Sequence, residues 1–163
     1  MTAARVHHSA IQVHDMDASL RFYRDGIGLE VLMDHVFEGD WPTLFDAPST
    51  TLRSIFLGDP RHPDVGIVEL VSFEVTARMA DALLANARVA DAPREPQLLA
   101  PTSAGFFLLS FYVDVDEVLA RLAALGFGPA RRLEQPGPTG SVAMASLRDP
   151  DGIRIEFVGV AAR

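Results

Sequence analysis

Two halves of this sequence repeat one order of apolar and polar residues, and this internal duplication limits the possible fold more strongly than any other feature. Residues 8–13 in the first half and residues 108–113 in the second both alternate in the way expected of a β-strand. An acidic segment follows each stretch, and a glycine closes the next apolar segment, Gly28 in the first half and Gly126 in the second. Leucines at helical spacing precede Gly126, so each half predicts a strand followed by a helix.

Three more strands are predicted after the helix of each half, because short apolar runs are separated there by turn-forming residues. These predicted strands cover residues 29–38, 51–57, 67–71, 129–134, 141–148 and 154–158. The helices are expected to be capped by Asp17 in the first half and by Asp114 or Asp116 in the second. The order strand, helix, strand, strand, strand therefore occurs twice.

The repeat also predicts how the chain is divided. Residues 1–73 are expected to form the first module and residues 104–163 the second, together one compact domain. Residues 74–103 belong to neither half and are predicted to be a linker with a helix in its first part. Residues 39–48 predict a loop or a helical turn, whose aromatic side chains are expected to pack as core or as a lid.

Composition narrows the class of protein. A chain of 163 residues with 48% hydrophobic and 22% charged residues is typical of a folded globular domain. Its formal net charge of −8 argues against nucleic acid and anionic membrane surfaces as partners. Residues 1–10 lack the apolar core of a signal peptide, and a cytoplasmic location is expected. Without cysteine, only imidazole and oxygen ligands can hold a metal.

A glutamate stands at the centre of the last apolar strand of each half, Glu69 in the first and Glu156 in the second. A buried carboxylate is costly unless it is neutralised, paired or coordinated, so both positions need an explanation. Strand alternation places His8 and Gln12 on one face of the first strand. If the halves pack as a pseudo-twofold pair, these faces can line one shared cleft.

The second half offers its own candidates for the same cleft. Ser110 and Tyr112 share one face of the strand that repeats residues 8–13. Arg154 lies two residues before Glu156 on the same face of the last strand. A structural interpretation is therefore also open, in which Arg154 forms an ion pair with one of the carboxylates.

The duplicated plan resembles the vicinal oxygen chelate superfamily, which includes glyoxalase I, extradiol dioxygenases and bleomycin-binding proteins. The segments that carry the resemblance are His8-Ser9-Ala10-Ile11, residues 15–25 with Gly28-Leu29, and residues 149–157. The resemblance covers about residues 6–73 and 104–160. It implies an α+β fold of two βαβββ modules, whose curved mixed sheets surround a shared cleft, and it implies a homodimer.

The resemblance also implies a set of metal ligands on the first and last strands of each half. His8 matches the first ligand, Glu69 the second and Glu156 the fourth, whereas the third position falls on Leu108 or Phe107. Neither of these two side chains can bind a metal. One imidazole and two carboxylates then remain for a divalent ion, whose identity (Mn, Mg, Zn, Ni or Fe) stays open, and a site without metal is the alternative.

Three functions follow as hypotheses. The first is a metal-dependent lyase or isomerase that acts on a small oxygenated substrate through a chelated enolate, with Glu69 or Glu156 as the general base. Gln12, Ser110, Tyr112, Arg154 and Leu108 would bind the substrate in the cleft. The second is a metal-free protein that binds an apolar or cationic small molecule, which an apolar side chain at the third position favours. The third is an extradiol ring-cleaving dioxygenase, which the missing second histidine argues against.

Overall fold

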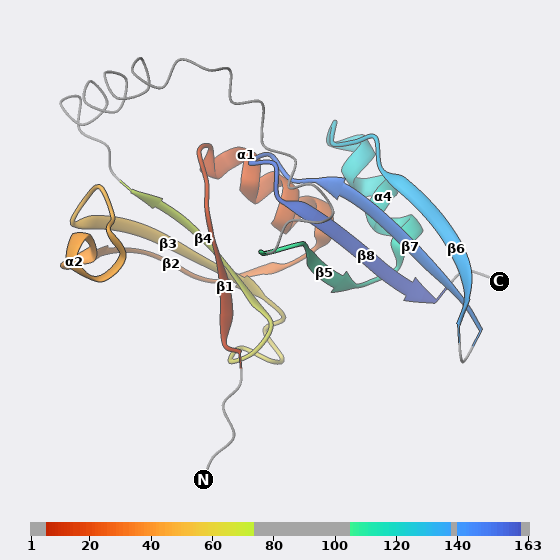
Figure 1. Cartoon of the computed structure of the whole chain (residues 1–163), viewed down its shortest axis with the longest axis horizontal. Helices are drawn as coiled ribbons and strands as arrows, with labels where there is room; N and C mark the ends of the chain where they lie inside the picture. Colours follow the sequence, from red (N-terminus) through yellow and green to blue (C-terminus); the bar gives the residue numbers. More distant parts are fainter. Residues whose placement is uncertain (1–5, 74–104, 138–139, 161–163) are drawn as a thin grey trace, which may run out of the picture. The chain divides into compact units, whose positions relative to one another are not determined.

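The computed structural model describes residues 6–73, 105–137 and 140–160, so the predicted linker and its helix lie outside the described residues. Figure 1 shows the arrangement of the described elements. In chain order these are β1 (His8–Gln12), α1 (Met16–Leu20), the π-helical segment η1 (Arg21–Ile27), β2 (Glu30–Glu38), α2 (Trp41–Phe45), β3 (Thr51–Gly58), β4 (Ile67–Phe73), β5 (Leu109–Tyr112), α4 (Val115–Ala124), β6 (Arg131–Gly137), β7 (Gly140–Arg148) and β8 (Arg154–Val160).

The described residues form two compact units. The N-terminal unit contains residues 6–13 and 30–73, and the C-terminal unit contains residues 14–29, 105–137 and 140–160. The helical segment of the first half, α1 with η1, therefore packs in the C-terminal unit, where η1 contacts α4. No helix of the described residues is long and apolar enough to cross a membrane.

Each unit contains one mixed sheet of four strands with the same topology. The strand order is β1-β4-β3-β2 in the N-terminal unit and β5-β8-β7-β6 in the C-terminal unit. In both sheets the first and last strands of the sequence repeat pair in parallel, and the other neighbours are antiparallel. This arrangement confirms the predicted α+β fold of two βαβββ modules.

The core of each unit follows from the alternation along its strands. In the N-terminal sheet, Ile11, Ile55 and Leu70 are buried on one face. In the C-terminal unit, Val118 and Leu122 of α4 are buried together with Phe157 of β8. The opposite face of the N-terminal sheet carries a mixture of polar and aromatic side chains, and this face holds the candidate site.

The helix starts differ in one respect from the prediction. Asp15, and not Asp17, caps α1, because its backbone is extended and its carboxylate accepts a hydrogen bond from the Ala18 amide. The prediction for Asp17 was wrong because that residue already lies in the first turn of the helix. Asp114 caps α4 in the same way, accepting from the Glu117 amide, as one of the two predicted alternatives.

A buried hydrogen bond joins η1 to the turn before β8 within the C-terminal unit. The Tyr23 hydroxyl donates to Asp149 Oδ2 over 2.7 Å, and both residues are buried. The other oxygen of Asp149 accepts from the amides of Asp151 and Ile153. Burial raises the pKa of the Tyr23 hydroxyl far above its ordinary value, and the Asp149 charge raises it further. The hydroxyl is therefore a permanent donor to this carboxylate.

Removing this donor should destabilise the protein. The Tyr23→Phe substitution leaves a buried oxygen of Asp149 without its hydrogen bond, which should lower the free energy of unfolding by about 1–3 kcal/mol. Urea unfolding monitored by circular dichroism measures the change. Tyr112→Phe is the matched control, because the Tyr112 side chain is 79% exposed. Equal stability losses in the two variants would contradict the structural importance of the buried bond.

Candidate functional site

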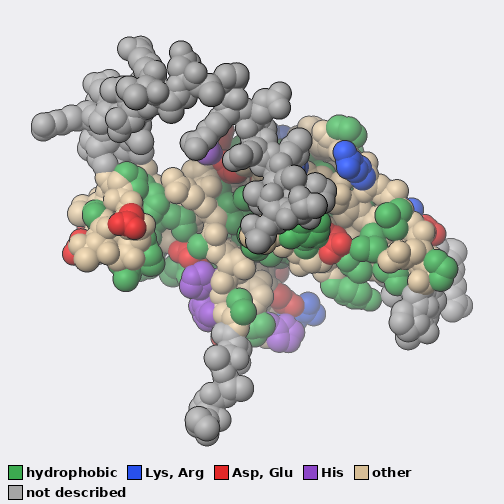
Figure 2. All heavy atoms as spheres, in the orientation of Figure 1, with side chains coloured by type: hydrophobic (Ala, Val, Ile, Leu, Met, Phe, Trp, Pro, Cys, Tyr) green, Lys and Arg blue, Asp and Glu red, His purple; other side chains and the backbone are tan. Residues whose placement is uncertain are grey.

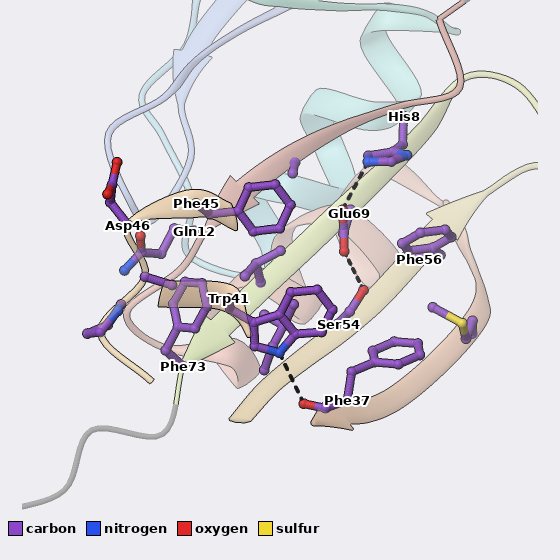
Figure 3. A pocket seen from close by; sticks show the side chains of 16 residues that line it. His8, Gln12, Phe37, Trp41, Phe45, Asp46, Ser54, Phe56, Glu69 and Phe73 are labelled. Carbon is purple, nitrogen blue, oxygen red and sulfur yellow. Dashed lines mark hydrogen bonds and ion pairs between the residues drawn. The ribbon is translucent and has the colours of Figure 1, made fainter. Parts of the chain in front are cut away.

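A cavity of about 590 Å³ lies on the polar face of the N-terminal sheet (Figure 3). Its floor is formed by side chains of β1, β3 and β4, and α2 with the residues after it closes one side. The residues that line it are His8, Ala10, Gln12, Met33, Phe37, Trp41, Phe45, Asp46, Ala47, Pro48, Leu52, Ser54, Phe56, Glu69, Val71 and Phe73. This volume falls in the range of ordinary small-molecule sites.

A row of three polar side chains in contact crosses one end of the cavity. Glu69 lies at its centre: one carboxylate oxygen accepts from the Ser54 hydroxyl over 2.5 Å, and the other lies 3.2 Å from His8 Nε2. The Glu69 side chain is 12% exposed and that of His8 is 39% exposed. The second ring nitrogen of His8 lies 2.8 Å from Nδ1 of His7. Both oxygens of this nearly buried carboxylate therefore have partners.

The register of the parallel strand pair explains why these groups meet. Ala10 of β1 is aligned with Glu69 of β4, and His8 stands two residues before Ala10 on the same face. The small side chain of Ala10 leaves room beside Glu69, so the imidazole of His8 can reach the carboxylate. Ser54 joins them from the neighbouring strand β3.

An aromatic wall stands at the other end of the cavity. The short helix α2 begins after Asp40, whose carboxylate accepts from the Thr43 amide. It presents the rings of Trp41 and Phe45, which are nearly parallel at 8° with centroids 6.0 Å apart. Gly39 allows this position of Trp41, because a Cβ there would lie 2.7 Å from the indole ring. Phe45 is 60% exposed, so it is a wall of the cavity and not part of the core.

The C-terminal unit places its own glutamate in different surroundings. Glu156 Oε2 accepts from the Ser110 hydroxyl over 2.7 Å, and Ser110 is aligned with Glu156 as Ala10 is with Glu69. A smaller cavity of about 220 Å³ lies against Glu156, lined also by Arg131 and Ser146. Because Ser110 corresponds to Ala10, Leu108, two residues earlier, corresponds to His8. Of the two residues considered from the sequence, Leu108 and Phe107, the register therefore selects Leu108.

The other predicted site residues are divided between the two units. Gln12 lines the larger cavity together with His8 and Glu69. Tyr112 belongs to the C-terminal unit and is largely exposed. The Arg154 guanidinium lies over the Phe107 ring, 4.7 Å from its centroid. This cation–π contact is the interaction that the structure records for Arg154, for which an ion pair with a carboxylate was one interpretation of the sequence.

Two parts of the site were missed by the sequence reasoning. Ser54 lies between Leu52 and Phe56 on one face of β3, and a polar residue between two apolar ones on that face was a signal that could have identified it. The aromatic wall was assigned to core or lid packing, because composition alone does not tell a cavity wall from a core. Both parts come from segments that the repeat does not relate to His8 or Glu69.

The cavity offers two potential ligand atoms for a divalent ion, His8 Nε2 and the nearer oxygen of Glu69. Ligand atoms about 2.0–2.2 Å from one ion lie roughly 3 Å apart, which agrees with the 3.2 Å between His8 Nε2 and the nearer Glu69 oxygen. Within residues 6–73, 105–137 and 140–160, no group of three or more His, Asp or Glu side chains is arranged to hold a metal. The convergence of Glu156 with this pair stays a prediction.

Comparison with known proteins identifies the family. The model of the Glyoxalase/Bleomycin resistance protein/Dioxygenase superfamily matches residues 5–157. The lactoylglutathione lyase-like protein terB of Aspergillus terreus is 32% identical over 160 residues, which cover 94% of this chain and 74% of that protein. The chain therefore belongs to this superfamily, as the resemblance in the sequence predicted.

Solved structures agree with the fold. A glyoxalase family protein from Bacillus cereus matches with a TM-score of 0.67 at 18% identity, over 99% of this chain and 97% of that one. A glyoxalase family protein from Enterococcus faecalis matches with a TM-score of 0.55 at 21% identity, over 94% of this chain and 96% of that one. At these identities, the likeness shows the common fold.

The hydrogen bond from Ser54 can be tested directly. Ser54→Ala removes the donor to a nearly buried carboxylate oxygen and should lower the free energy of unfolding by about 1–3 kcal/mol. Ser110→Ala is the matched control, because it removes the same kind of bond to Glu156 at an exposed serine. Chemical unfolding of the two variants gives the comparison. A larger loss in Ser110→Ala than in Ser54→Ala would contradict the assigned burial.

Proposed function

We propose that this protein is an enzyme of the lyase or isomerase type, in which Glu69 and His8 move a proton on a small oxygenated substrate held in the cavity. The observation that carries the proposal is a glutamate, 12% exposed, on the wall of an apolar cavity with an imidazole nitrogen 3.2 Å away. A carboxylate and an imidazole side by side are suited to general acid–base work. The family and the lyase-like name of the relative from Aspergillus terreus support the reaction class.

The proposed step is a proton transfer next to a carbonyl group. The Glu69 carboxylate removes a proton from the carbon beside the carbonyl, and the electrons of that C–H bond form the carbon–carbon double bond of an enolate. When no metal is bound, His8 donates a hydrogen bond to the enolate oxygen, which takes up the carbonyl π electrons. Return of the proton to the opposite face of the same carbon, or to the far end of a double bond conjugated with the enolate, completes an isomerisation without any oxidant. Ser54 holds the carboxylate in place through its second oxygen.

A divalent metal is a further part of the proposal. His8 and Glu69 would supply two of its ligands, and Glu156 is proposed as the third. When bound, such an ion would act as a Lewis acid on the substrate oxygens. Leu108 at the position corresponding to His8 leaves that coordination position without a protein ligand. The protein's subunit partner is proposed to be a second copy of itself.

A second candidate function is a binding protein without catalytic activity. The specific observation that favours it is the apolar lining of the cavity, in which aromatic and aliphatic side chains outnumber polar ones. Binding of a ligand without any proton exchange would support this candidate over the enzyme.

Proton exchange tests the enzyme directly. With β-tetralone in D₂O, the wild-type protein should accelerate the exchange of the protons beside the carbonyl, as measured by NMR. Glu69→Gln should lower the catalysed rate by about 100-fold or more, because the general base is lost. Glu38→Gln is the matched control, because Glu38 is an exposed glutamate on β2 outside the cavity lining. Wild-type exchange no faster than in buffer would reject this activity for the probe ketone, and equal rates in the two variants would reject Glu69 as the base.

Metal binding has a separate test. Thermal melts with Mn²⁺, Zn²⁺, Ni²⁺ or Fe²⁺ should show a higher Tm for the wild-type protein, because an ion that binds the folded state stabilises it. Glu156→Gln should reduce this rise, because it removes a charged oxygen donor from a site with few ligands. If no metal raises the wild-type Tm, the metal part of the proposal is wrong. If Glu156→Gln keeps the full rise, Glu156 is not a ligand.

A further inference from the structure

The lining of the larger cavity selects its ligand by charge as well as by shape. Among its sixteen lining residues, all within the described part of the chain, the acidic side chains are Glu69 and Asp46, and His8 is the histidine. Neither lysine nor arginine is present in this lining. Around α2, the face seen in Figure 2 carries hydrophobic and acidic side chains. The field inside the cavity therefore disfavours anions.

The aromatic side chains select a flat ligand. Five of the lining residues are Phe37, Trp41, Phe45, Phe56 and Phe73. Because the rings of Trp41 and Phe45 are nearly parallel, a flat ligand that stacks on one of them is parallel to both. The volume of about 590 Å³ accommodates more than one ring.

The two ends of the cavity differ in chemistry, and this difference orients the ligand. Figure 3 shows His8, Glu69 and Ser54 in a row beside Phe56, and Trp41 and Phe45 beyond them with Phe73. A polar oxygen of the ligand fits the end at His8 and Glu69, while the rings fit the aromatic end. An anionic group at either end would meet Glu69 or Asp46 instead of a cation.

We infer that the substrate is a flat aromatic compound with a carbonyl or hydroxyl oxygen and without an anionic group, and not an anionic thiol conjugate such as a glutathione adduct. The inference rests on the proposed function, because the bound compound is a substrate only if the protein is an enzyme. The same binding preference holds for the ligand of a binding protein. It separates this chain from what the name of its lactoylglutathione lyase-like relative suggests. Glutathione carries two carboxylates, for which the described lining offers no guanidinium or ammonium partner.

Calorimetric titration at neutral pH tests the charge preference with four probes: naphthol, naphthoate, naphthylmethylammonium and S-lactoylglutathione. The first three share one ring system and differ in charge. Naphthol should bind, and naphthoate should bind about tenfold or more weakly, because like charges are brought together. S-lactoylglutathione should produce no binding heat. Naphthylmethylammonium should bind more tightly than naphthoate. Binding of naphthoate as tight as that of naphthol or of naphthylmethylammonium, or binding of S-lactoylglutathione as tight as that of naphthol, would overturn the inference.

Two variants test where naphthol binds and which side chain causes the preference over naphthoate. Phe45→Leu should weaken naphthol binding by about 3- to 10-fold through lost stacking. Phe106→Leu is the matched control, because Phe106 is 61% exposed and lies in the C-terminal unit, against 60% for Phe45. Asp46→Asn should reduce the preference for naphthol over naphthoate, and asparagine tolerates the left-handed backbone of this position, where φ is 54°.

The outcomes separate this inference from the proposed function. Naphthol binding that is unaffected by Phe45→Leu, or a preference unchanged by Asp46→Asn, would overturn the assignment of the ligand to this cavity and of the selectivity to its charges. Neither result depends on proton exchange. A protein that binds naphthol as expected but fails to exchange β-tetralone protons would retain the inferred ligand class and lose the enzymatic proposal.

Discussion

The parallel pairing of the first and last strands of each half is the constraint on which the rest of the site depends. In the N-terminal sheet it aligns Ala10 with Glu69, so that His8 reaches the carboxylate from the same face. A shift of one residue would turn His8 to the opposite face, because side chains alternate along a strand. The antiparallel neighbour β3 then adds Ser54, which occupies the remaining oxygen of Glu69.

The two sheets share one strand register but give their central glutamates different partners, because two residues differ between the repeats. Leu108 stands where the N-terminal unit has His8, and Ser110 stands where it has Ala10. Glu69 therefore faces an imidazole over a large cavity, whereas Glu156 is held by a serine of its own strand pair. The register is the same in both sheets while the side chains on it differ, which is one way in which a fold family can host several chemistries.

Much of the fold was predictable because its signals are local. Alternation along residues 8–13 and 67–71 placed His8, Gln12 and Glu69 on their strands, and the repeat extended this to the second half. The capping of α1 by Asp15 was missed, because two aspartates two residues apart offer the same side chain. A loop or a helical turn was expected here, with its aromatic side chains as core or lid, but the place of Trp41 in the cavity was not, because it depends on how α2 folds onto the sheet.

The sequence by itself determined the order of strands and helices along the chain and which polar residues of β1 and β4 share a face, because periodicity and turn residues act over a few neighbouring positions. Tertiary structure alone decided which side chains touch. The first-half helix packs with α4 in the C-terminal unit, Ser54 meets Glu69, and Trp41 with Phe45 forms an aromatic wall. These contacts join residues distant in the chain, and their partners are selected by shape, burial and hydrogen bonding once the sheets have formed.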